Sequence, residues 1–310
     1  MPEAPIVECV PNLSEGRDPS VVVEIIRAMQ VSGVSLLDWS MDADHNRSVV
    51  TLAGPPEAVA EAAILGVGRA AEVIDLTRQS GVHPRVGAVD VVPFVPVQGY
   101  SVGQCAALAH HVGVEIWRRY GIPVYFYEAA ARRPDRVKLE DVRRGQFEGL
   151  QEAVRTDPTL CPDVGTCELH PSAGASLLGA RDFLIAYNIY LREASLETAR
   201  AIARAVRASS GGLPCVKAMG VLVDGQAQVS INLTDFRRTP VSQVYARVVE
   251  LAMQHGIEVG VGELIGLIPQ TALESGMGGS DVPEWARQIP GFRVEDRVLE
   301  QRLQRPLAWP

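Results

Sequence analysis

The sequence predicts an α/β (α+β) protein of two ferredoxin-like domains, each with the element order strand, helix, strand, strand, helix, strand. Two observations carry this prediction. The same order of strand-like and helix-like segments occurs twice along 310 residues, a length that suits two domains. In the second half, Asp224 and Gly225 separate two β-branched segments, and an Asp-Gly pair in this position is a strong hairpin signal.

The first half carries the first copy of this order. Pro19 suits the first turn of a helix with one apolar face, and a long alanine-rich helix starts near Pro55. Pro93 interrupts a valine-rich strand, which indicates an edge strand or a bulge. An added helix and strand follow the copy. The expected strands are 6–11, 34–40, 48–54, 86–97 and 122–128, and the expected helices are 19–31, 55 to before 81, and 101–120.

The second half carries the second copy, in which Ser195 is a candidate N-cap for an amphipathic helix. The expected strands are 183–191, 216–223, 226–236 and 257–269, and the expected helices are 195–208 and 240–255, with a short helix within 292–303. We place the boundary near residues 178–182. The N-terminal domain is then 1–180 and the C-terminal domain, with its short helical tail, is 181–310.

Two segments between the copies lack a regular pattern. Residues 132–155 are rich in arginine, and such a run is more often a solvated helix face than a binding patch. Residues 163–181 contain many small side chains and little periodicity. A long segment without a pattern inside a compact chain is more often functional than accidental, so residues 163–181 are a candidate binding segment.

Composition narrows the class of protein. A net charge of −8 argues against nonspecific nucleic-acid binding but allows a local basic pocket for anionic small molecules. The five cysteines are scattered and form no CxxC, which disfavours a zinc or thioredoxin-like site and fits a reducing compartment. The first residues lack a signal-peptide pattern and no apolar run is long enough for a membrane helix. We therefore expect a cytoplasmic protein with no membrane or nucleic-acid partner.

His83 is the first candidate for chemistry. It lies in the segment GVHPR, between an expected helix and an expected strand, and Pro84 restricts its backbone to extended or turn conformations. Histidine titrates near neutral pH and is the commonest general acid–base group. The alternative is an ordinary loop histidine without a catalytic role.

The segment DADHNRS, residues 42–48, is the second candidate. Asp42, Asp44 and His45 permit a metal site, but turns attract Asp for backbone reasons alone, and we favour no metal. Asn46 and Arg47 fit better as anchors for a carboxylate, because a guanidinium offers a bidentate fork.

The segment PNLSEG, residues 11–16, is the third candidate. Asn12, Ser14 and Glu15 could bind a polar ligand. The same residues could instead cap the entry to the first helix, and the two interpretations have equal weight.

Five segments, in order, resemble successive blocks of the formiminotransferase family, which includes the first part of formiminotransferase-cyclodeaminase and stand-alone bacterial relatives. They run from about residue 6 to residue 275 and read VECVPNLSEGR, DADHNRSVVTLAGPPEAV, GVHPRVGAVDVVPFVPV, DFLIAYNIYL and SINLTDF. The resemblance implies a two-subdomain unit with the active site in the cleft between the subdomains, and a homodimer. The chain stops where the cyclodeaminase part would start, so that second activity is expected to be absent.

The resemblance also implies roles for particular residues. The family's catalytic histidine corresponds to His83. A carboxylate that vertebrate members carry after their LLD run is Ser40 here, and Asp42 or Asp44 is the expected substitute. The folate-binding segment corresponds to ten consecutive residues, Gly165, Thr166, Cys167, Glu168, Leu169, His170, Pro171, Ser172, Ala173 and Gly174.

The resemblance implies transfer of the formimino group from N-formimino-L-glutamate to tetrahydrofolate as co-substrate, with a histidine as general acid and base and no metal. Both substrates carry anionic tails, so the expected substrate-binding cations are Arg47, Arg85, Arg181 and Lys217, and Asn188 and Asn232 join the substrate-binding set. Two alternatives stay open. One is transfer of a formyl group from N-formylglutamate, giving 5-formyltetrahydrofolate, and the other is a non-catalytic folate- or metabolite-binding protein.

Overall fold

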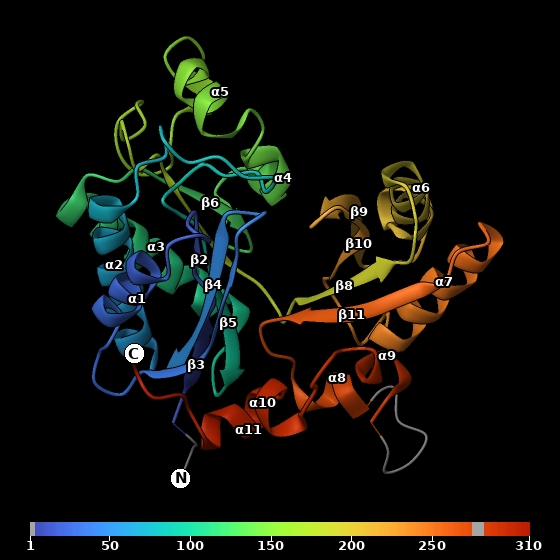
Figure 1. The fold of residues 1–310 in the computed structure, drawn as a ribbon. Helices are drawn as coiled ribbons and strands as arrows, with labels where there is room; N and C mark the ends of the chain where they lie inside the picture. Colours follow the sequence, from blue (N-terminus) through green and yellow to red (C-terminus); the bar gives the residue numbers. More distant parts are fainter. Residues whose placement is uncertain (1–3, 275–281) are drawn as a thin grey trace. The chain divides into compact units, whose positions relative to one another are not determined.

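The computed structural model describes residues 4–274 and 282–310, and the chain forms two compact units (Figure 1). The first unit ends at Arg181 and also takes in Pro306–Pro310, and the second unit is Asp182–Arg305. The last five residues, which we expected in the second domain, belong to the first unit because the backbone N–H of Leu307 donates to the carbonyl of Leu36 at 2.8 Å.

The first unit contains a seven-stranded sheet in the order β1-β4-β2-β5-β7-β6, with β3 added outside β4. Its strands are β1 Ile6–Cys9, β2 Asn12–Leu13, β3 Ser35–Asp42, β4 Arg47–Gly54, β5 Val89–Gln98, β6 Val124–Glu128 and β7 Ser176–Ala180. Strands β1 and β2 both pair with β4 on one side and β5 on the other, so they act as one interrupted strand. The first five strands therefore form the predicted ferredoxin-like order, which β7 and β6 extend by parallel pairing.

Three long helices pack against this sheet, namely α1 Pro19–Ala28, α2 Pro56–Val73 and α3 Val102–Tyr120. Local sequence fixes their ends. Asp18 caps α1, whose buried side includes Ile25 and Ile26, and a Ser101–Gln104 capping box starts α3. Shorter helices, η1 Pro134–Arg136, α4 Leu139–Val142, α5 Gln146–Ala153 and η2 Pro158–Leu160, connect β6 to β7.

Two expectations for the first unit need correction. Strand β7 lies in the segment that seemed to have no pattern, because all five of its residues are buried and the usual alternation is absent. Pro93 is not on an edge strand, since β5 lies between β1/β2 and β7, and the register shifts occur at Ile6/Val7 and Asn12/Leu13. The long alanine-rich helix ends at Val73, before Gly81 as predicted.

The second unit has a four-stranded antiparallel sheet in the order β11-β8-β10-β9, which is the ferredoxin-like order. Its elements are β8 Ile185–Leu191, α6 Leu196–Val206, η3 Ala208–Ser210, β9 Val216–Val223, β10 Gln226–Leu233, α7 Val241–Gln254 and β11 Val259–Ile265. Asp224 and Gly225 have φ values of 49° and 73°, as the predicted hairpin turn requires. Four short helices follow, α8 Gln270–Glu274, α9 Glu284–Arg287, α10 Val294–Arg297 and α11 Leu299–Gln304.

No helix in the described part of the chain combines the length and apolarity that a membrane crossing needs.

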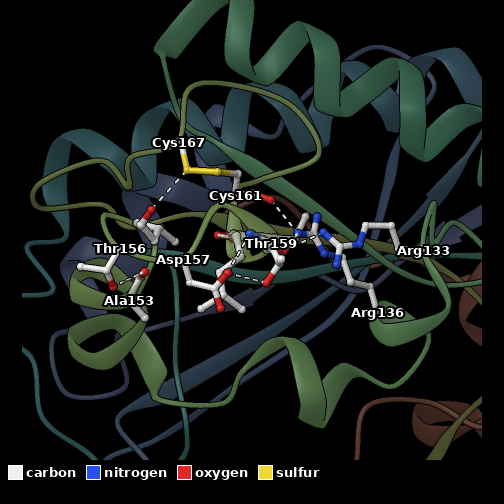
Figure 2. Close-up of a disulfide and its surroundings, with 11 residues drawn as sticks. Arg133, Arg136, Ala153, Thr156, Asp157, Thr159, Cys161 and Cys167 are labelled. Atoms are coloured by element: carbon white, nitrogen blue, oxygen red, sulfur yellow. Dashed lines mark hydrogen bonds between the residues drawn. A yellow bond between two sulfur atoms is a disulfide. The ribbon is translucent and has the colours of Figure 1, made fainter.

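A disulfide joins Cys161 and Cys167 in the connection between β6 and β7 (Figure 2). From the sequence we expected unpaired cysteines in a reducing compartment, where disulfides are rare, so this disulfide differs from that expectation. Arg136 holds the same loop, because its guanidinium donates to the carbonyl of Cys161 at 2.6 Å and pairs with Asp163 at 2.8 Å. The disulfide and the ion pair together fix the start of the segment Gly165–Gly174.

Replacing both bridged cysteines is expected to lower the free energy of unfolding of the first unit by about 2 kcal/mol, because a short closed loop constrains the unfolded chain by about this amount. The variant Cys161→Ala/Cys167→Ala is compared with Cys215→Ala, whose thiol is unbridged, in urea titrations with and without dithiothreitol. Equal stability of the wild type with and without reductant would rule out a stabilising disulfide.

Candidate active site

His83 lies in the loop between α2 and β5 and is half-buried. Its Nδ1 is 3.0 Å from a terminal guanidinium nitrogen of Arg47 and 2.8 Å from the carbonyl oxygen of Pro84. The arginine can only donate and the carbonyl can only accept. Nδ1 therefore accepts from Arg47 in one tautomer and donates to Pro84 in the other, and either contact holds the ring in the same orientation.

Asp90 is the buried anion of this region and has no solvent exposure. Arg47 donates to its Oδ2 at 2.9 Å, Arg143 donates to the same oxygen at 2.5 Å, and the backbone N–H of Val86 donates to Oδ1 at 2.8 Å. Burial acts to raise the pKa of Asp90, but Arg143 and Arg47 outweigh it and the pKa is lowered. Asp90 is thus a permanent carboxylate that holds two guanidinium groups near His83.

The charges around His83 do not balance. Two guanidinium groups face one carboxylate, so the group carries one excess positive charge. Burial and then the charges of Arg47 and Arg143 lower the pKa of His83 to about 2, and burial lowers the pKa of Arg47 to about 10. His83 is therefore neutral at physiological pH, and the excess charge favours an anionic ligand beside it.

The segment 11–16 connects β2 to the loop that carries His83. Ser14 donates to the carbonyl of Gly87 at 2.7 Å. The carboxylate of Glu15 accepts from the backbone N–H groups of Arg17 and Asp18 at 2.7 and 2.9 Å and from the side chain of Gln79 at 2.6 Å. Ser14 and Glu15 are buried and hold loops together in this structure, and their binding of a ligand stays a prediction.

Asn12, from the same segment, instead forms a hydrogen bond with Arg47. Its Oδ1 accepts from Nε of Arg47 at 3.0 Å, and its amide donates to the carbonyl of Val10 at 2.8 Å. The Arg47 guanidinium is therefore held by Asn12 and Asp90 in an orientation that reaches His83.

The turn between β3 and β4 places its polar residues in different roles. Asp42 accepts from the backbone N–H of His45 and pairs with the ring of His45 at 2.8 Å, and the hydrogen bond to His45 lowers the pKa of Asp42. Asn46 is buried, accepts from the N–H of Gly16 at 2.9 Å and donates to the carbonyl of Ser80 at 3.1 Å. Asn46 thus ties this turn to the His83 loop.

Asp44 and His45 flank the same loop. The carbonyl of Asp44 accepts from the N–H of Val82 at 3.2 Å, and the ring centroids of His45 and His83 are 6.3 Å apart. Within residues 4–274 and 282–310, no three His, Cys, Asp or Glu side chains form a cluster that could hold a metal ion.

Arg85 is engaged by the protein itself. Its guanidinium donates to the carbonyls of Leu76 and Gln79 at 3.1 and 2.5 Å and pairs with Glu148 of α5 at 2.8 Å. Its Nε is buried and donates to no acceptor among the described residues. Arg85 joins the loop after α2 to α5, and the role in substrate binding that we expected for it stays a prediction.

The arginine-rich segment divides into exposed and buried members. The side chain of Arg144 is 82% exposed, as a solvated face predicts, whereas those of Arg136 and Arg143 are 6% and 13% exposed. Arg136 pairs with Asp163 and Arg143 with Asp90. The expectation of a solvated face is therefore wrong for these two residues, because each meets a buried carboxylate from another part of the chain.

The predicted folate segment, Gly165–Gly174, lies beside both ends of the His83 loop. The carbonyl of Ser172 accepts from the N–H of Leu76 at 2.8 Å, and the carbonyl of Ala173 accepts from the N–H of Ala88 at 2.9 Å. Gly174 has φ 69°, and an added Cβ would lie 1.9 Å from the carbonyl of Val86. A residue without a side chain is therefore required where the two segments meet.

Within this segment, burial separates two groups of residues. Leu169 and Ala173 are buried, and the ring of His170 accepts from the N–H of Ala173 at 3.0 Å. Burial lowers the pKa of His170. The exposed members, which could meet a ligand directly, are Gly165, Thr166, Glu168 and Pro171.

The remaining predicted binding residues lie elsewhere. Arg181 follows β7, and its N–H donates to the carbonyl of Phe94 at 3.1 Å. Lys217 and Asn232 are exposed cross-strand neighbours on β9 and β10 of the second unit. Asn188 of β8 is buried, and its side-chain amide donates to Glu263 at 3.0 Å. Only Arg181 shares the unit that contains His83.

Sequence reasoning missed Asp90 and did not single out Arg143. A signal for Asp90 was present, because a lone carboxylate in the valine-rich segment VGAVDVVPF must be buried with a partner. The partner itself could not be identified, since Arg143 is one of several arginines in a segment of irregular structure.

The sequence matches two models of the same family. The model of the formiminotransferase domain, N-terminal subdomain, matches residues 6–181, and the model of the formiminotransferase domain matches residues 186–277. Together these matches span most of the chain.

Curated relatives agree with these matches. The chain is 40% identical to glutamate formimidoyltransferase of Streptococcus pyogenes serotype M1, over 97% of this chain and 99% of that protein. It is 41% identical to the protein of the same name from Thermoplasma acidophilum, over 97% and 98%. It is also 41% identical to formimidoyltransferase-cyclodeaminase of Gallus gallus, over 87% of this chain but only 51% of that protein. The chain belongs to the formiminotransferase family.

Proposed function

We propose that this protein transfers the formimino group of N-formimino-L-glutamate to tetrahydrofolate, giving 5-formiminotetrahydrofolate and L-glutamate. Support comes from the near-full-length relatives named glutamate formimidoyltransferase. The single observation that carries the chemistry is the position of His83, a neutral histidine between Arg47 and the Pro84 carbonyl, in a loop bonded to the predicted folate segment.

His83 moves the proton in this proposal. The N5 amine of tetrahydrofolate attacks the amidine carbon, and the tetrahedral intermediate must lose a proton from N5 and gain one on the glutamate nitrogen. A neutral imidazole takes the first proton and delivers the second, which contributes roughly 10²–10⁴-fold in rate. The lowered pKa of His83 guarantees the neutral form before the reaction, and a bound substrate carboxylate would offset the charges of Arg47 and Arg143.

The excess positive charge at Arg47 and Arg143 supports a carboxylate site near His83, because a guanidinium binds a carboxylate through a fork of N–H groups. Arg181 and Lys217 remain proposed contacts for the anionic tails of glutamate and folate. We also propose, as the family resemblance implies, a homodimer in the cytoplasm, although the Cys161–Cys167 disulfide is unusual for that compartment.

Replacing His83 with Ala is expected to lower turnover by at least about 10²-fold while folate binding persists, because the variant loses the proton relay. The matched control is His111→Ala, since His111 is exposed on α3. Turnover is measured at saturating donor and tetrahydrofolate, and folding is checked by circular dichroism. Full activity of a folded His83→Ala variant would exclude the proposed role.

The lowered pKa of His83 predicts a pH dependence of stability. In the unfolded chain His83 protonates below about pH 6.5, whereas in the folded protein it does not. The free energy of unfolding therefore falls as the pH falls, by up to about 1.4 kcal/mol per pH unit. Urea unfolding at pH 7.5 and pH 5.5 is expected to show a larger loss for the wild type than for His83→Gln. An equal loss for both proteins would mean that His83 titrates normally in the folded state.

The protein is expected to prefer N-formimino-L-glutamate over N-formyl-L-glutamate. Asp42 keeps its charge because its pKa is lowered, so it offers an acceptor to a protonated formimino group and none of the donors that a formyl oxygen needs. A formyl oxygen that faces Asp42 is left without a hydrogen-bond donor, which costs about 1–3 kcal/mol. We therefore expect kcat/KM for the formyl donor to be lower by up to roughly a hundredfold. The assay supplies each donor in turn with tetrahydrofolate, and equal or better use of the formyl donor would favour the formyltransferase alternative.

A further inference from the structure

The second unit holds a polar cluster, Asn188, Gln228 and Glu263, on the sheet face opposite α6 and α7. These residues come from β8, β10 and β11, and their strands are neighbours in the sheet. Glu263 is opposite Asn188 in the β8–β11 register. The core side of β10 is formed by Val229, Ile231 and Leu233, so Gln228 points to the other face.

Both amides of this cluster donate to one carboxylate oxygen. The distance to Oε2 of Glu263 is 3.0 Å from Nδ2 of Asn188 and 3.4 Å from Nε2 of Gln228. Because Gln228 directs its amide nitrogen to the carboxylate, its amide oxygen is a hydrogen-bond acceptor. Gln228 is fully buried, yet its Oε1 accepts no hydrogen bond from any described residue. A buried acceptor of this kind ordinarily has a partner.

Glu263 lacks a cationic partner as well. Across the described chain, no lysine, arginine or histidine forms an ion pair with it, and its side-chain partners are the two neutral amides. Glu263 is of intermediate exposure, and burial of a charge is ordinarily accompanied by a cation. The cluster therefore presents one negative charge and a buried acceptor, and it lacks a group that supplies N–H donors and positive charge.

A planar group with two N–H donors on one carbon fits this arrangement, because it meets a carboxylate through two parallel hydrogen bonds. A divalent metal fits less well, since calcium and magnesium sites ordinarily use several carboxylates and this cluster has one. Two ligands of the proposed reaction carry such an N–C–N edge. One is the protonated formimino group of the donor, and the other is the 2-aminopyrimidinone edge of the reduced folate ring.

We propose that Asn188, Gln228 and Glu263 form a binding subsite for the N–C–N donor edge of a substrate, with Glu263 as the specificity-determining residue. This inference rests on the proposed function for the identity of its ligands. It adds Gln228 and Glu263 to the predicted substrate-binding residues and gives Asn188 a definite role, which is to hold the carboxylate of Glu263 in place.

The test is the variant Glu263→Gln, which removes the charge and keeps the size of the side chain. Calorimetry measures the affinity for N-formimino-L-glutamate, N-formyl-L-glutamate and 5-formyltetrahydrofolate. Loss of one hydrogen bond to a charged group is expected to weaken binding of the subsite's ligand by about tenfold or more. Loss for the formimino donor but not the formyl donor assigns the subsite to the formimino group, and loss for the folate assigns it to the pterin ring. The matched control Glu258→Gln, an exposed carboxylate next to β11, is expected to change all three affinities by less than twofold.

A second variant, Gln228→Met, removes the buried acceptor and keeps the volume, and it is expected to weaken the same ligand as Glu263→Gln. Unchanged affinity for all ligands in both folded variants would overturn the subsite. Turnover by the wild type is assayed separately. Absence of formimino transfer by the wild type would refute the proposed function, whereas an active wild type with unaffected Glu263 and Gln228 variants would refute only this inference.

Discussion

The buried carboxylate of Asp90 is the interaction on which the candidate site depends. It binds Arg47 at the start of β4 and Arg143 from the connection after α4, and it accepts from the N–H of Val86 at the end of the His83 loop. Three segments far apart in sequence thus converge on one side chain. Removing one partner of such a pair typically costs about 3–5 kcal/mol, because it leaves a buried charge uncompensated. The position of Arg47, and through it the orientation of His83, therefore follows from Asp90.

A second network holds the loops around this centre. Glu15, Asn46 and Gln79 link the first helix entry, the β3–β4 turn and the loop after α2. Backbone hydrogen bonds from Leu76 and Ala88 to Ser172 and Ala173 then attach the predicted folate segment to the same loop. Polar residues that looked like ligand contacts thus serve first to hold loop backbone, since buried backbone groups must find partners. A preorganised loop is what the proposed proton relay requires.

The two clusters described here have opposite electrostatic character. Around His83, two guanidinium groups exceed one carboxylate, which favours an anion, and burial together with these charges keeps the histidine neutral. Around Glu263, one carboxylate and two amides favour a group with N–H donors. Formiminoglutamate and folate each carry both kinds of group, namely carboxylates and an N–C–N edge. Each cluster thus suits one of these two kinds of group, although the net charge of −8 indicates neither cluster.

The sequence by itself determined the two ferredoxin-like units and the Asp224–Gly225 hairpin, because helical and strand periodicity and turn chemistry are local signals. The tertiary structure decided the rest. Strand β7 is buried on both faces, so its small residues carry no alternation that a pattern could detect. Contacts between residues distant in sequence decide the arginine partners of Asp90 and the acceptor of Gln228 that is left without a partner. The pairing of Cys161 with Cys167 likewise depends on how the connection between β6 and β7 folds. Such contacts arise only when the strands and loops are packed together, and no spacing along the chain encodes them.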